Sequence, residues 1–225
     1  MAQLGITPRP FLKQTIKLYF DLLDNERNSE VLMSLLYAIG HNNEKLSKAQ
    51  IDKLCSLADT KNNLVKEGLV SALLGVDNLN AIETLIKLSS DKLSHIRNWA
   101  TFGTGTQTER NSKKIRAALW DRVCDKHKET KLEAILGLAK RKNKGVNEII
   151  RQELIDGEYG TLLFEAIVET GDKQFLPLLQ QNLKLGKVDK GISPDWLTLL
   201  CHNNYTENQR DSLSLSIRKK RSGNR

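Results

Sequence analysis

Apolar residues recur along most of the chain three or four positions apart, and short polar turns separate the runs. The first such run consists of Phe11, Leu12, Ile16, Tyr19, Phe20 and Leu23. This spacing places the apolar side chains on one face of a helix. No segment alternates apolar and polar residues for long enough to predict a strand. The pattern therefore predicts an all-α protein.

The predicted helices are 8 to 16 residues long and lie between turns rich in Asn, Asp, Lys and Gly. Asn28 or Ser29 is expected to cap the second helix, Gly40 to end it, and Ser47 to cap the third. Further helices are predicted at 62–75, 79–90, 94–103, 113–124, 129–140, 146–155, 160–170, 174–185 and 194–201.

One apolar phrase repeats along the chain every 29 to 34 residues. Clear copies begin at Val65, Ile96 and Thr130, and weaker ones at Val31 and Leu163. A period in this range is typical of a solenoid, in which each unit buries its apolar face by stacking on the next. The repeat therefore predicts antiparallel helix pairs, one pair per repeat. Stacked on one another, these pairs would form a single α-solenoid (superhelix) over residues 1–217.

The two ends of the array depart from the repeated phrase. The expected parts are an N-terminal cap at 1–26, repeats at 28–185, a C-terminal cap at 194–217 and a disordered basic tail at 218–225. Five arginines and lysines of that tail account for most of the net charge of +8. The overall charge is therefore weak evidence for a nucleic-acid-binding domain.

Composition places the protein in a reducing compartment and outside the membrane. Cys55, Cys124 and Cys201 are odd in number and far apart, which predicts neither a disulfide framework nor a metal site. The chain begins without the features of a signal peptide, and no apolar run approaches a membrane span. We expect a cytoplasmic monomer.

A second regularity involves charged residues around the start of the second helix of a repeat. Asp91 precedes Arg97 by six residues, and Asp125 precedes Lys131 by six. An acid at this place suits the free N–H groups and dipole of the helix. The base one turn later is expected to pair with the acid of its own or the adjoining unit, giving a structural ladder along the array.

The segments 91–103 and 131–142 resemble the repeat phrases of bacterial HEAT-repeat proteins of the PBS-lyase type. The resemblance extends over residues 60 to 185, approximately, and rests mainly on the phrases RNWATF and EAILGLAKRK. It implies a solenoid of HEAT-like helix pairs. Some proteins of this group are encoded beside Rhs-type toxin genes, which implies an immunity or accessory role in a toxin system.

The copies of the phrase disagree most at Trp99 and Phe102. Other copies have Ser34, Gly68 and Glu133 at the position of Trp99, and Tyr37, Ser71 and Leu136 at that of Phe102. We expect the second helices to line a concave face. The predicted partner-binding residues at its middle are Arg97, Asn98, Trp99, Thr101 and Phe102. The alternative is that both aromatic residues fill space between repeats.

A nucleic-acid-binding solenoid is the alternative function. Lys140, Arg141, Lys142 and Lys144 could contact a polyanion, although cations at a helix C-terminus are also explained by the helix dipole. A glycosylase for alkylated DNA would need Trp99, Trp120 and Trp196 to converge with an acid such as Asp121.

The sequence predicts no catalysis, cofactor or metal site. His41, His95, His127 and His202 lack metal-ligand spacing, and no nucleophile or phosphate-loop motif occurs. The function expected is a non-catalytic scaffold that binds another protein on its concave face.

Overall fold

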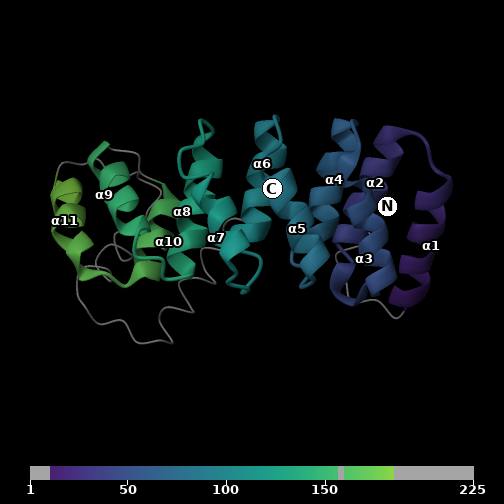
Figure 1. The fold of residues 1–225 in the computed structure, drawn as a ribbon, viewed down its shortest axis with the longest axis horizontal. Helices are drawn as coiled ribbons and strands as arrows, with labels where there is room; N and C mark the ends of the chain where they lie inside the picture. The colour runs from purple at the N-terminus through teal and green to yellow at the C-terminus, as the bar shows by residue number, and fades with distance from the viewer. Residues whose placement is uncertain (1–10, 157–159, 185–225) are drawn as a thin grey trace. The chain divides into compact units, whose positions relative to one another are not determined.

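The computed structural model describes residues 11–156 and 160–184, and its helices are packed in sequential pairs (Figure 1). Its α-helices are α1 (Leu12–Asn25), α2 (Ser29–Gly40), α3 (Lys48–Cys55), α4 (Asn63–Leu73), α5 (Leu79–Leu88), α6 (Ser94–Gly105), α7 (Lys113–Trp120), α8 (Lys128–Lys140), α9 (Val146–Asp156), α10 (Thr161–Thr170) and α11 (Leu176–Lys184). Short 3-10 helices are η2 (Asn43–Lys45), η3 (Ser56–Asp59) and η4 (Lys173–Phe175). The predicted all-α, HEAT-like fold class is confirmed.

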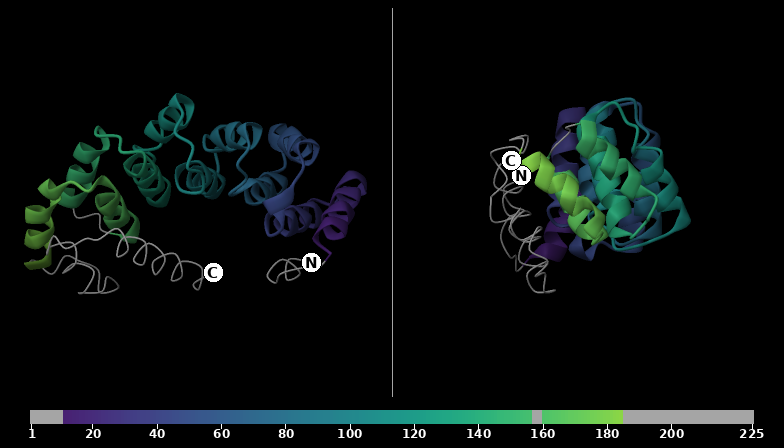
Figure 2. Two further views of the ribbon diagram at one scale, coloured as in Figure 1. Left: turned by 90° about the horizontal axis from the view of Figure 1, so that it is seen from below. Right: turned by 90° about the vertical axis from the view of Figure 1, so that its left-hand side faces the viewer.

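The chain divides into two compact units, residues 1–138 and 139–225. In the first unit, α2 contacts α4 and α4 contacts α6, while α3 contacts α5. Second helices thus form one row and first helices another, as the left-hand view of Figure 2 shows. Successive pairs therefore pack against one another, as expected for stacked repeats.

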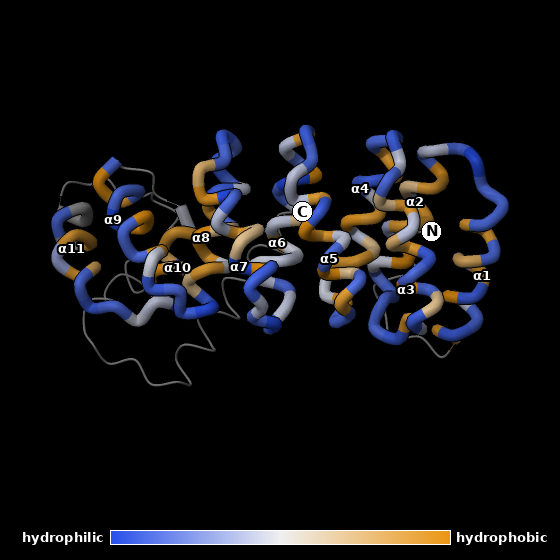
Figure 3. Tube along the Cα trace, in the orientation of Figure 1, coloured by the Kyte–Doolittle hydropathy of each residue, from blue (hydrophilic) through white to orange (hydrophobic). Residues whose placement is uncertain are grey.

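The core of the first unit is apolar and continuous from α1 to α6. Leu36, Leu69, Leu73 and Ile96 are among its fully buried side chains. Polar residues concentrate at the turns and helix ends, which are blue in Figure 3. Burial of one stripe per helix explains why the sequence shows a helical period.

In the second unit, α10 packs against α9 and η4 against α11. Phe164 and Phe175 are buried there. Gly171 ends α10 in the left-handed region, with φ 65°, and its N–H donates to the Ile167 and Val168 carbonyls. Glycine is the residue that adopts this conformation without steric cost.

Side-chain caps set several of the helix starts. Asn28 caps α2 by accepting hydrogen bonds from the Glu30 and Val31 amides. Ser47 forms a reciprocal capping box with Gln50 at the start of α3. These two predicted caps are confirmed.

Several predicted helix ends differ from the structure: α4 ends at Leu73 and α5 at Leu88, two residues before the predicted ends, and the ends of α6 and α7 differ as well. Helix α6 continues through Gly103 to Gly105, because its backbone stays helical until the Thr106 N–H donates to the Phe102 carbonyl. Helix α7 ends at Trp120 and not at Cys124, because the chain turns immediately after it.

Glycines bring the second helices of the first unit into close contact. A Cβ built on Gly68 of α4 would lie 2.8 Å from Leu36 Cβ and 3.0 Å from the Met33 carbonyl oxygen of α2. One built on Gly40 would lie 2.5 Å from the Ser71 carbonyl oxygen. Gly40 is the last residue of α2, as predicted, but its glycine is required by the approach of α4.

Several predicted segments lie wholly or partly outside the described residues. These are the N-terminal cap in its first ten residues, the C-terminal cap at 194–217 and the basic tail at 218–225. Within the described part of the chain, no helix has the length and apolar character needed to cross a membrane.

Candidate functional site

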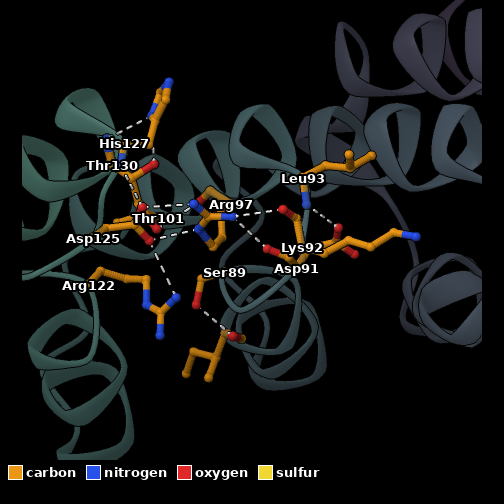
Figure 4. Close-up of polar contacts among 11 residues, drawn as sticks. Ser89, Asp91, Lys92, Leu93, Arg97, Thr101, Arg122, Asp125, His127 and Thr130 are labelled. Atoms are coloured by element: carbon orange, nitrogen blue, oxygen red, sulfur yellow. Dashed lines mark hydrogen bonds and ion pairs between the residues drawn. The ribbon is translucent and has the colours of Figure 1, made fainter.

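A polar cluster in the first unit surrounds Arg97 at the start of α6 (Figure 4). Its Nε and Nη2 atoms donate to the two carboxylate oxygens of Asp125, at 2.7 and 2.8 Å. Nη1 donates to the carbonyl oxygens of Asp91 and Lys92. All three guanidinium nitrogens are therefore engaged within the scaffold.

An equivalent ion pair joins the preceding units. Lys66 Nζ of α4 lies 2.6 Å from Asp91 Oδ2, and the side chains are 17% and 7% exposed. In both rungs the base of one unit pairs with the acid of the next unit. The prediction left open whether each base pairs with the acid of its own unit or of the adjoining unit. For Asp91, Arg97 and Asp125, the structure shows pairing between adjoining units. The pairing of Lys131 stays a prediction.

The two acids of the ladder have lowered pKa values. The Arg97 hydrogen bonds are the main cause for Asp125, and they outweigh the effect of burial. Burial alone would raise the pKa of Asp91, but the Leu93 amide and Lys66 together bring it below its usual value. Both carboxylates are therefore charged and fixed near neutral pH.

The aromatic pair lies on α6 beside this ladder. The Trp99 and Phe102 rings form an edge-to-face contact, with centroids 5.6 Å apart and planes at 85°. Both side chains are half-buried, and Trp99 also packs against the core shared by α1 to α6. The two alternatives for Trp99 are therefore combined, because the ring fills space between repeats and still reaches the surface.

Polar side chains connect α6 to the neighbouring second helices. Glu67 of α4 accepts a hydrogen bond from Tyr37 Oη at 2.8 Å, and its other oxygen lies 3.5 Å from His95 Nε2. Asn98 Nδ2 reaches Glu129 of α8 at 3.5 Å. We call this area the second-helix surface and define it by Tyr37, Glu67, His95, Asn98, Trp99, Phe102 and Glu129.

The Tyr37–Glu67 contact has a clear electrostatic effect. Burial and the bond to the Glu67 carboxylate raise the pKa of Tyr37 to about 12. The hydroxyl therefore remains a donor throughout the physiological range.

Two of the predicted partner-binding residues belong to the scaffold instead. Thr101 is fully buried, and its hydroxyl donates to the Arg97 carbonyl, so the prediction that it contacts a partner is wrong. Arg97 is 15% exposed and is already engaged at every nitrogen. Asn98, Trp99 and Phe102 are brought together at the surface.

Sequence reasoning missed Tyr37, Glu67, His95 and Glu129. The repeat period contained a signal for two of them. In its own copy of the phrase, Tyr37 occupies the position that Phe102 has in α6, and Glu129 occupies the position that His95 has there. The contacts between copies could be recognised only after the helices were stacked.

The predicted polyanion-binding run lies at the end of α8 and in the following turn. Lys142 and Lys144 are exposed and line a pocket of about 430 Å³ in the second unit, together with Asn147 and Asp172. Lys142 adopts φ 51°, and its ammonium group donates to the Glu169 carbonyl. Lys140 and Arg141, the other two members, are half-buried.

The residues proposed for a glycosylase are only partly described. Trp120 is the last residue of α7 and is half-buried, while Asp121 is exposed beside it. Trp196 lies outside the described residues. Among the residues with described positions, no group of three His, Cys, Asp or Glu side chains could hold a metal ion.

Comparisons with known proteins relate the chain to a helical repeat protein. No family model matches the sequence. Protein YibA of Escherichia coli, in strain K12 and in O157:H7, is 33% identical over 123 residues, a match that covers 55% of this chain and 44% of YibA. The chain therefore matches less than half the length of these relatives.

A solved X-ray structure of Escherichia coli YibA is similar to this fold. The alignment has a TM-score of 0.50 and 23% identity, and covers 84% of this chain and 80% of that one. The chain is thus a distant homologue of YibA with the same HEAT-like arrangement of helix pairs. At this identity the likeness concerns the fold alone.

Proposed function

We propose that this protein is a non-catalytic protein-binding module whose partner contacts the second-helix surface. The observation that carries the proposal is the half-buried Trp99–Phe102 pair on α6, the helix that is also fixed through the nearly buried Arg97–Asp125 ion pair. Aromatic residues on a rigid support are the side chains that dominate binding hot spots. Rigid support reduces the entropy lost on association.

A specific version of this proposal is an immunity or accessory role in a bacterial toxin system. It rests on the resemblance to HEAT-repeat proteins encoded beside Rhs-type toxins. In that version the partner is the toxin, and the module acts by covering a surface on it.

Affinity capture from the native host, followed by quantitative mass spectrometry, tests the proposal. Trp99→Ala and Phe102→Ala are expected to lose the same captured protein. Trp120→Ala is the matched control, since this half-buried aromatic residue lies on a first helix. Thermal unfolding of each variant separates lost binding from lost folding, and equal loss in the control would contradict the proposal.

Nucleic-acid binding is a second candidate, favoured by the pocket beside Lys142 and Lys144. Phosphate contacts make affinity fall steeply with salt. In a salt titration with a labelled oligonucleotide, Lys142→Glu with Lys144→Glu is expected to abolish binding if this candidate is correct. Binding that instead disappears on removal of residues 218–225 would assign it to the tail.

A further inference from the structure

The two rows of helices in the first unit differ in charge. Taken together, α1, α3, α5 and α7 carry eight lysines and arginines against four carboxylates, whereas α2, α4 and α6 together carry two of each. The cations of those second helices, Lys66 and Arg97, are paired with the nearly buried Asp91 and Asp125. Little positive charge therefore remains on this row to act at the surface.

The permanent charges of the second-helix surface are Glu67 and Glu129. Lys128 and Lys131 of α8 occupy the repeat positions of Ser94 and Arg97, on either side of Glu129 in sequence. The residues that define the second-helix surface therefore carry two permanent negative charges, although the chain as a whole is basic.

Glu67 and Glu129 approach α6 from opposite sides. Glu67 comes from α4 and lies near His95, while Glu129 comes from α8 and lies near Asn98, both at 3.5 Å. Along the exposed stripe of α6, His95, Asn98, Trp99 and Phe102 follow at helical spacing. The aromatic pair is therefore flanked by one carboxylate from each neighbouring helix.

This surface is also rich in hydrogen-bond acceptors. Both contacts to α6 are at the long limit of a hydrogen bond, and each carboxylate oxygen has a second lone pair. A ligand with several N–H donors and a positive charge fits such a site best.

We propose that the partner presents a cationic segment here, with an arginine stacked against Trp99 between Glu67 and Glu129. This inference rests on the protein-binding function proposed above. A guanidinium group combines stacking on an indole face with paired donation to carboxylates. Nucleic acid is disfavoured at this place, because the two carboxylates repel phosphate groups.

Fluorescence anisotropy with three labelled probes tests the proposal: an arginine-rich peptide, its glutamate-for-arginine counterpart, and a single-stranded oligonucleotide of similar length. The arginine peptide is expected to bind despite the net charge of +8. Glu67→Gln with Glu129→Gln is expected to weaken that binding about tenfold, because the shape is kept and the charge removed.

The matched control removes the same charge from the first-helix side. Asp77 and Glu83 pair there with Arg110 and Lys114, and Asp77→Asn with Glu83→Gln is expected to change peptide binding less than about twofold. Equal weakening by both double variants would overturn the proposal, because the peptide would then respond to net charge alone.

The other outcomes separate this inference from the proposed function. If the glutamate peptide binds and its binding depends on Phe102, the inference of a cationic partner would be overturned, but the proposed protein-binding function would stand. Oligonucleotide binding that is weakened by Phe102→Ala would overturn both.

Discussion

The α2–α4 and α4–α6 interfaces use equivalent repeat positions but residues of very different size. Where α4 places Gly68 against α2, with no room for a Cβ, α6 places Trp99. Gly40 of α2 likewise corresponds to Leu74 after α4. In α6 a different glycine makes room, since a Cβ on Gly103 would lie 2.9 Å from both Leu74 Cδ2, just after α4, and Leu85 Cδ1 of α5.

The difference shows how one repeat is specialised without loss of the stack. The α2–α4 interface is backbone against backbone, so it is rigid and leaves no side chain to present at this position. Helix α6 is instead packed through the leucine side chains of Leu74, just after α4, and Leu85 of α5, and through an indole ring. This packing keeps the helices together while the edge of the aromatic pair reaches the surface.

The largest expected effect concerns the ladder that supports the specialised repeat. Arg97→Ala should lower the free energy of unfolding by about 3–5 kcal/mol, because it removes both short guanidinium hydrogen bonds to the nearly buried Asp125 and leaves only the 3.5 Å Arg122 contact and the His127 amide. Lys66→Ala should cost less, about 1.5–3 kcal/mol, since Lys66 makes a single bond to Asp91. Urea unfolding measures both, and equal losses would contradict the stronger role of the bidentate rung.

Added methyl groups test the rigid and the adaptable interface directly. Gly68→Ala should cost about 1–3 kcal/mol, because Leu36 Cβ and the Met33 backbone cannot move away. Gly103→Ala should change stability by less than about 1 kcal/mol, since the leucine methyl groups can shift and alanine favours the helix. The measurement is thermal unfolding, with exposed Ser34→Ala as the control.

Removal of the aromatic pair separates stability from binding. Trp99→Ala should cost about 1–2 kcal/mol, below the range for a fully buried tryptophan, because the ring is half-exposed. Phe102→Ala should cost about 1 kcal/mol or less, mainly the edge-to-face contact. A loss of more than about 3 kcal/mol for Trp99→Ala would identify it as a core residue and weaken the proposed surface.

Acid should weaken the ladder. The pKa of Asp125 is lowered in the folded state, so its stabilising contribution is complete above the unfolded-state pKa of about 4 and disappears as the pH falls through the folded value. The melting temperature of the wild type should therefore decrease as the pH is lowered below about 4. Asp125→Asn should flatten this pH dependence, whereas Asp121→Asn, at an exposed position, should leave it unchanged.

The smallest effect is expected at Tyr37, on the α2–α4 side of the surface. Its pKa of about 12 lies above the unfolded value near 10, so the folded state loses stability as the pH rises between these values. Tyr37→Phe should remove this alkaline dependence and cost about 1 kcal/mol at neutral pH. Tyrosinate absorbance of wild type and variant measures the titration, and a normal pKa would contradict the Glu67 contact.

Much of the fold followed from residues that act within one helix. The apolar stripes predicted the helix pairs, and Asn28 and Ser47 predicted two starts, because caps act over three residues. The six-residue spacing of acid and base predicted a ladder but not its register. Pairing within one unit or between adjoining units requires the rise between helices, which no local pattern contains.

The candidate site was predictable in its centre and not at its edges. Trp99 and Phe102 were found because they differ from their counterparts in other copies. Thr101 was misplaced, since a threonine between them in sequence faces the core in space. Glu67 and Glu129 were missed because each belongs to a different helix from the pair that it flanks.

The sequence by itself determined the period, the helical class and the place where the copies disagree most, because these depend on side-chain order along one chain. Only the tertiary structure decided which carboxylate neutralises Arg97, where Gly68 and Gly103 admit a neighbour, and which side of α6 meets solvent. Those properties arise where helices from different repeats meet. Contacts there depend on separations of an ångström or less, which the residue order does not specify.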